Sequence, residues 1–94
     1  MKLYMLDGEK CIPTDDASKA FSDQGKIIGR TEIGETLIST IFLGMDHGFF
    51  GEPLLFETMI FGGKHDNYRE RYSTYAQAEA GHQIAVDLVK SENN

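Results

Sequence analysis

The chain has 94 residues and a net charge of −6 with its histidines neutral, and 40% of its residues are hydrophobic. This length and composition suit one globular domain, so we expect a single domain over residues 1–94. The acidic balance excludes a general nucleic-acid binder, which needs a basic patch to displace counterions. No apolar run approaches the roughly 20 residues that span a bilayer, and the N-terminal segment is too short for a signal peptide. We therefore expect an intracellular protein without a membrane segment.

The N-terminal residues predict a small hairpin. Residues 2–6 alternate weakly in hydrophobicity and end at Asp7–Gly8, a strong turn pair, after which residues 9–12 return as a second arm. Pro13 is expected to stop regular pairing. The single cysteine, Cys11, can form no internal disulfide and no thiolate zinc site alone, so we interpret it as a small apolar residue of a strand.

A short helix is predicted next. Thr14 followed by Asp15 and Asp16 is typical of a helix start, because a capping hydroxyl precedes carboxylates at the positive end of the helix dipole. The helix should run to about Asp23 and end before Gly25. Its buried residues are expected to be Ala17, Ala20 and Phe21.

The clearest hairpin joins residues 26–33 to residues 35–43 through a two-residue loop at Gly34–Glu35. This loop sets the register, and the predicted pairs are Ile33 with Thr36, Thr31 with Ile38, and Ile27 with Phe42. One apolar face then carries Ile27, Ile33, Ile38 and Phe42. The opposite face mixes polar and apolar residues, so part of it is expected to be covered as well.

Residues 54–61 form a third strand of the same quality, and residues 68–72 are expected to add a short edge strand. The connection from Gly44 to Pro53 is longer than the 2 to 5 residues usual in a hairpin. Its apolar residues are Met45, Phe49 and Phe50. The connection is therefore either folded under the domain or displayed for a partner.

The last element is a helix over residues 75–90, because Thr74 and Gln77 form a capping box. Its apolar stripe consists of Tyr75, Ala78, His82, Ala85, Val86, Leu88 and Val89. Gly81 at the border of the stripe would let the helix approach a sheet closely. The fold class is thus α+β: an antiparallel sheet of about 4–5 strands, with the C-terminal helix packed on one face and a short helix after the first strand.

Two histidines invite a functional interpretation. His82 lies in the apolar stripe, where it is expected to bond a backbone carbonyl or a sheet side chain; the alternative is a ligand or base pointing at the sheet. Asp46–His47 is typical of a local turn in which the carboxylate bonds nearby amides. Alternatively, one of these two residues meets Glu57, His65 or His82 in a zinc or iron site.

Glu57 interrupts an otherwise apolar strand, so its carboxylate must lie at an edge, be paired, or have a raised pKa. Pairing with Arg30, or with an arginine of residues 69–71, is the simple interpretation; a general base or ligand is the alternative. Serine elbows, phosphate-binding glycine loops and dinucleotide fingerprints are missing, so the sequence predicts no cofactor and no specific catalytic class.

Three segments, residues 39–49, 53–63 and 71–82, resemble a family of small proteins of tailed bacteriophages and prophages. The resemblance covers about residues 27–83. The family has no established activity, so the resemblance implies no catalytic residues; it implies a phage or prophage setting and the cytoplasm of a bacterial host. Members often have a tryptophan-rich helix after the first strand, whereas residues 17–22 contain no tryptophan, so any contact the family makes through that helix is in doubt here.

The leading functional hypothesis is a non-enzymatic accessory protein that binds a host or phage protein, one version being a counter-defence inhibitor. Phe49 and Phe50 are the candidate contact residues. A second hypothesis is a small metal- or ligand-binding enzyme that uses Asp46, His47, Glu57 and His82. A third is a structural or virion-associated component that assembles through an exposed strand edge. The sequence predicts no oligomeric state.

Overall fold

The computed structural model describes residues 2–48 and 50–92. In chain order its elements are β1 (Leu3–Asp7), β2 (Lys10–Thr14), α1 (Ala17–Asp23), β3 (Ile27–Ile33), β4 (Thr36–Phe42), β5 (Phe56–Phe61), β6 (Arg69–Tyr72) and α2 (Tyr75–Glu92). Strands β3-β4-β5-β6 form one antiparallel sheet in that order, and β1-β2 form a separate hairpin. The predicted α+β fold is confirmed.

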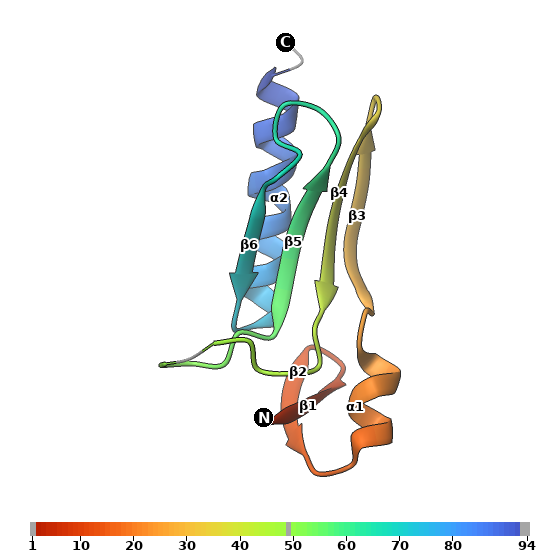
Figure 1. Cartoon of the computed structure of the whole chain (residues 1–94), viewed down its shortest axis with the longest axis vertical. Helices are drawn as coiled ribbons and strands as arrows, with labels where there is room; N and C mark the ends of the chain where they lie inside the picture. The colour runs from red at the N-terminus through yellow and green to blue at the C-terminus, as the bar shows by residue number, and fades with distance from the viewer. Residues whose placement is uncertain (1, 49, 93–94) are drawn as a thin grey trace.

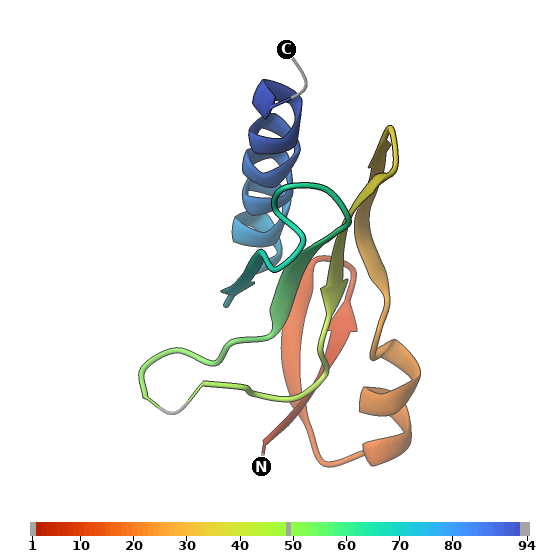
Figure 2. The ribbon, with the colours of Figure 1, turned by 45° about the horizontal axis from the view of Figure 1, so that its top comes forward.

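The molecule has two layers over most of its length. Helix α2 runs along one face of the four-stranded sheet and touches all four strands, while the β1-β2 hairpin and α1 lie together beyond one end of the sheet (Figures 1 and 2). In the part of the chain that the structure describes, no helix covers the opposite face of the sheet (Figure 1). That face is called the open sheet face below.

The N-terminal hairpin differs from the prediction at Pro13. This residue lies inside β2, opposite Tyr4, instead of ending the pairing. A proline is tolerated there because β2 is the outer strand of the hairpin, where a nitrogen needs no ladder partner. The other strand, β1, is bonded to the chain that leaves β4. The main-chain amide of Tyr4 donates to the Gly44 carbonyl at 2.9 Å, and Leu3 forms an isolated β-bridge with Met45.

Helix α1 begins two residues later than its sequence suggests. The Asp16 carboxylate caps it by accepting from the amides of Ser18 and Lys19, while the Thr14 hydroxyl accepts from the Asp16 amide. Ala20 is buried as predicted. The expected burial of Ala17 and Phe21 is wrong, because this two-turn helix covers the hairpin with only one narrow face.

The β3-β4 hairpin confirms the two-residue loop and two of its three predicted pairs, Ile33 with Thr36 and Thr31 with Ile38. The third is wrong: Ile27 lies opposite Ile41, because a bulge interrupts the register between Ile27 and Gly29. A bulge adds one residue to a strand and reverses the faces beyond it. Ile27 is therefore 59% exposed on the open sheet face, and Ile28 packs into the core instead.

The capping box of α2 is confirmed. The Thr74 hydroxyl accepts from the Gln77 amide at 3.1 Å, and the Gln77 side-chain oxygen accepts from the amides of Thr74 and Ser73. These bonds satisfy donors that a helix start otherwise leaves unpaired. The helix consequently begins at Tyr75, as predicted.

The core consists of two apolar clusters, one between α2 and the sheet and one that extends from there to the β1-β2 hairpin. The first contains Leu6, Phe42, Leu55, Phe56 and Ala78. The second contains Ile38, Ile60, Ala85, Val86 and Val89. Along β4 and β5, Thr40 and Thr58 lie between these clusters, both fully buried, so a polar layer divides the core.

Gly81 brings α2 close to the sheet edge, as predicted. A Cβ atom at this position would lie 2.2 Å from the ring of Tyr72 on β6. Only glycine leaves room for the tyrosine ring, so its absent side chain sets the distance between α2 and β6.

We expect Gly81→Ala to destabilise the protein by about 1–3 kcal/mol through this overlap, although alanine is the better helix former by about 1 kcal/mol. Urea unfolding followed by circular dichroism measures the change. In a Tyr72→Ala background the same substitution should become neutral or stabilising, because the overlapping ring is gone. A stabilising effect of Gly81→Ala in the wild-type chain would contradict the close contact.

Candidate functional site

His82 lies at the centre of the polar layer. Its Nδ1 is 2.7 Å from the hydroxyl of Thr40, and its Nε2 is 2.9 Å from the hydroxyl of Thr31. Gly29 on β3 makes room for the ring, since a Cβ atom there would lie 2.9 Å from it. The interpretation of His82 as a histidine bonded to sheet side chains is confirmed.

The polar layer satisfies its own hydrogen bonds. A neutral imidazole donates through one ring nitrogen and accepts at the other, and each of them faces a threonine hydroxyl that can take either role. The Thr40 hydroxyl also lies 2.5 Å from that of Thr58, which extends the chain of bonds to a third strand. Burial lowers the pKa of His82, so the imidazole is held neutral at physiological pH and acts as a cross-link between α2, β3 and β4.

Asp46 organises the base of the loop between β4 and β5. One carboxylate oxygen accepts from the amides of Gly48 and Leu54 at 2.8 and 3.0 Å, and these two bonds lower the pKa of Asp46. The main-chain amide of His47 donates to the Leu54 carbonyl at 3.1 Å. The turn interpretation of Asp46 is confirmed.

Beyond this base the loop projects from the molecule (Figure 2). The side chain of Phe50 is 96% exposed, so at this residue the loop is not folded under the domain; display for a partner stays a prediction. Met45, by contrast, is half-buried beside β1. Phe49, the other predicted contact residue, lies outside the described residues.

Glu57 is buried although it lies on the open sheet face. Its carboxylate accepts from Arg71 Nε at 2.8 Å and lies 3.6 Å from Arg69 Nε. The predicted pairing with the 69–71 segment is therefore confirmed, and the pairing with Arg30 is wrong. Arg30 lies two strands away on β3, where it pairs with Glu32 at 3.1 Å.

The predicted site residues do not converge. Thr58 faces the polar layer with His82, and successive residues of a strand point to opposite faces, so Glu57 and His82 lie on opposite sides of the sheet. The carboxylate of Asp46 is bonded to the main-chain amides of Gly48 and Leu54 at the base of its own loop. Within residues 2–48 and 50–92, no group of three or more His, Cys, Asp or Glu side chains is arranged to hold a metal.

The sequence did not identify the open sheet face as a surface. It carries alternate residues of each strand: Ile27, Arg30, Glu32, Leu37, Ser39, Ile41, Glu57, Met59, Phe61, Arg69 and Arg71. All three arginines of the chain belong to it, and with its two glutamates its net charge is +1, against −6 for the whole chain. The strand pattern predicted a mixed face, but strand order was needed to bring these side chains together.

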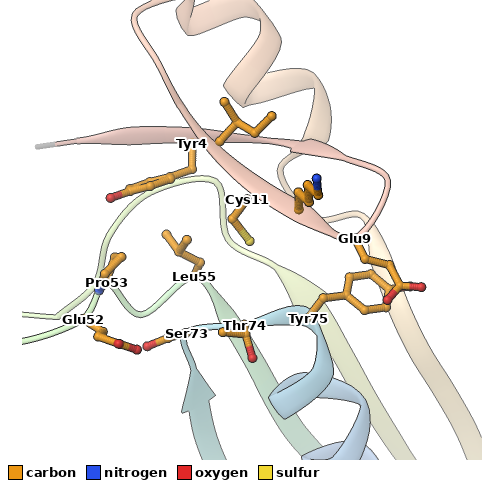
Figure 3. A pocket seen from close by; sticks show the side chains of 11 residues that line it. Tyr4, Glu9, Cys11, Glu52, Pro53, Leu55, Ser73, Thr74 and Tyr75 are labelled. Carbon is orange, nitrogen blue, oxygen red and sulfur yellow. The ribbon is translucent and has the colours of Figure 1, made fainter.

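A concave surface lies beside the loop. This N-terminal pocket has a volume of about 480 Å³ and is lined by Tyr4, Glu9, Lys10, Cys11, Ile12, Glu52, Pro53, Leu55, Ser73, Thr74 and Tyr75 (Figure 3). Its walls come from the β1-β2 hairpin, the chain entering β5 and the start of α2. Burial raises the pKa of the Cys11 thiol, so this residue lines the pocket as a neutral apolar group.

No protein-family model, curated protein or solved structure matches the chain significantly. The resemblance to phage proteins accordingly stays a prediction. In the described part of the chain, neither helix is both long and apolar enough to cross a membrane.

The polar layer predicts a pH-dependent stability. Because burial lowers the pKa of His82 below its ordinary value of 6.5, the unfolded chain binds more protons near and below that pH, and the free energy of unfolding falls as the pH falls. His82→Gln removes this contribution and, through lost hydrogen bonds, costs about 1–3 kcal/mol at neutral pH. In urea unfolding, the difference in the free energy of unfolding between the wild-type chain and His82→Gln should shrink as the pH falls from about 7.5 to about 5.

The matched control is Gln83→Ala at the next, exposed position of α2, whose effect on stability should not change over this pH range. A loss of stability in His82→Gln that grows on acidification would contradict a neutral, half-buried imidazole. The NMR resonances of the His82 imidazole in the wild-type chain provide a direct measurement, because their titration midpoint should lie below 6.5.

The loop base predicts a local effect of Asp46→Ala. Without the carboxylate, the Leu54 amide loses its acceptor, and its hydrogen exchange should accelerate roughly tenfold while the core amides change little. Exchange followed by NMR measures this. Glu52→Ala in the same loop is the control and should leave Leu54 protected; equal protection in both variants would show that the carboxylate does not close the loop.

Proposed function

We propose that the chain is a small protein-binding module that docks its partner on the open sheet face. The observation that carries this proposal is the composition of that face. Two of its apolar side chains are exposed, Ile27 by 59% and Phe61 by 44%, and they flank the half-buried side chains of Leu37, Ile41 and Met59. Contiguous apolar surface with a polar rim is typical of interaction sites.

The charged residues of this face favour the same conclusion. Protein interfaces are enriched in arginine, methionine and aromatic residues and depleted in lysine, and the open sheet face has three arginines and no lysine. The hydrogen bond to Glu57 orders the side chain of Arg71, while Arg69 lies 3.6 Å from the same carboxylate, so the pair of arginines keeps an excess of positive charge. Pre-ordered side chains lose less entropy on binding.

The partner that fits this face is a protein surface with an apolar centre and neighbouring carboxylates. Arginine guanidinium groups bind carboxylates through two parallel hydrogen bonds. At physiological salt, charges more than about 8 Å apart are largely screened. The local charge of +1, rather than the net charge of the chain, therefore governs the close contact.

The biological setting is proposed from the resemblance described above. Its three segments contain a large part of the open sheet face, including Ile41, Met59 and Arg71. The proposal is a phage or prophage accessory protein that acts in the cytoplasm of a bacterial host by binding a host or phage protein. A counter-defence inhibitor is one version, in which the bound host protein belongs to a defence system.

The test is affinity capture from bacterial lysate with a matched pair of variants. Phe61→Glu places a charge in the apolar surface at one end of the open sheet face, and we expect it to weaken capture of a specific protein at least roughly tenfold, since hot-spot residues contribute about 2 kcal/mol or more. Ile84→Glu changes a 63% exposed apolar residue of α2 and should leave capture unchanged.

Both substituted side chains are solvent-exposed, so both variants should fold, which circular dichroism checks. A partner captured equally by the wild-type chain and Phe61→Glu would place the contact elsewhere. If neither the wild-type chain nor either variant retains a specific protein from lysates of infected and uninfected cells, the proposal is wrong.

A further inference from the structure

Phe50 is the most exposed large apolar side chain among the described residues, at 96%. It lies at the end of the loop that Asp46 closes, so the fold holds it away from the core. Single exposed apolar residues are common on protein surfaces. What distinguishes Phe50 is that its loop also forms part of the N-terminal pocket.

The pocket is formed in part by the same loop. Glu52 and Pro53, two and three residues after Phe50, line one wall, and Tyr4, Cys11 and Tyr75 line the others (Figure 3). Its volume of about 480 Å³ falls within the range of about 300–1,000 Å³ found for pockets that bind organic groups. Aromatic and aliphatic walls of this kind suit a phenyl ring.

We propose that the chain forms a reciprocal dimer in which Phe50 of each copy occupies the N-terminal pocket of the other. The exposed ring and one wall of the pocket belong to one loop, so a two-fold axis passing beside that loop brings each ring to the opposite pocket. Such an interface uses the same surface on both copies and closes at two. Within one chain the ring of Phe50 does not occupy the pocket, because this side chain is almost fully exposed.

The charges around the pocket predict how the contact responds to salt. Glu52 travels with Phe50 on the loop, and the pocket that receives them is lined by Glu9, Lys10 and its own Glu52. These carboxylates outnumber the single lysine, and together with the net charge of −6 on each copy they oppose association. Raised salt screens this repulsion, and the dimer should therefore strengthen with salt.

The size of the contact predicts its strength. A buried aromatic side chain removes about 150–250 Å² from water, so two rings and their two pockets bury roughly 600–1,000 Å² in total, below the ~1,200 Å² of standard stable interfaces. The dimer is therefore weak and concentration-dependent. It does not depend on docking at the open sheet face, which lies on a different surface.

Sedimentation equilibrium of the full chain from about 10 µM to about 1 mM tests this inference, a range that covers the affinities of small interfaces. We expect a monomer–dimer equilibrium that Phe50→Ala weakens at least roughly tenfold. Phe21→Ala removes another exposed aromatic side chain, on α1, and should leave it unchanged. A wild-type chain that stays monomeric at the highest concentration, or a dimer that persists in Phe50→Ala, would overturn the proposal.

A disulfide trap identifies the contact itself. Cys11 is the only cysteine of the chain, and Figure 3 shows its sulfur pointing from the hairpin into the pocket. In Phe50→Cys, the thiolate of one residue attacks oxidised glutathione, and the second thiolate then displaces glutathione from the mixed disulfide, so two thiols are oxidised and one oxidised glutathione is reduced to two thiols.

The expected product is a covalent dimer on a non-reducing gel whose cross-link joins position 50 to Cys11, as peptide mass spectrometry shows. Phe21→Cys is the control and should form far less of it. A cross-link within one chain, or equal dimer from both variants, would contradict the reciprocal arrangement. Circular dichroism confirms folding, which substitution of an exposed side chain should not disturb.

Discussion

The position of α2 on the sheet depends on the imidazole of His82, which two strands hold between their threonine hydroxyls. The apolar clusters on either side are non-directional, and alanine and valine side chains would permit the helix to slide by a fraction of a turn. The imidazole bonds have direction and satisfy each other only in one position. A buried polar group that loses its partners is costly, so this layer selects one arrangement of helix and sheet among several of similar apolar burial.

The same arrangement explains why one sheet face stays open. The described residues contain one long helix, and residues 3–23 form a hairpin and a short helix that extend the core beyond the end of the sheet rather than across its second face. An antiparallel sheet with one face in water normally carries polar residues there. Here Ile27, Met59 and Phe61 occupy it instead, and the paired arginines keep the face from being purely apolar.

Helix starts and tight turns could be predicted from the sequence where a few adjacent residues determine them. The Thr74–Gln77 capping box and the Gly34–Glu35 loop each follow from a few adjacent residues. The predicted pairing of Ile27 is wrong because a bulge interrupts the register between Ile27 and Gly29, and the two-residue loop at the other end of the hairpin does not indicate it. The partner of Glu57 required the strand order, which places Arg71 beside it and Arg30 two strands off. The N-terminal pocket joins three distant segments, so no local pattern indicates it.

The hydrogen bonds of the Asp46 carboxylate affect which changes of sequence the fold can tolerate. It closes the loop at Gly48 and Leu54, and the Leu43 amide, which donates to the Leu55 carbonyl at 2.7 Å, secures the chain just behind it. Among the described residues between these anchor points, Phe50, Gly51 and Glu52 are exposed. Changes at these three positions should therefore leave the scaffold intact, which makes them a natural place for insertion of a foreign peptide and for rapid evolutionary change.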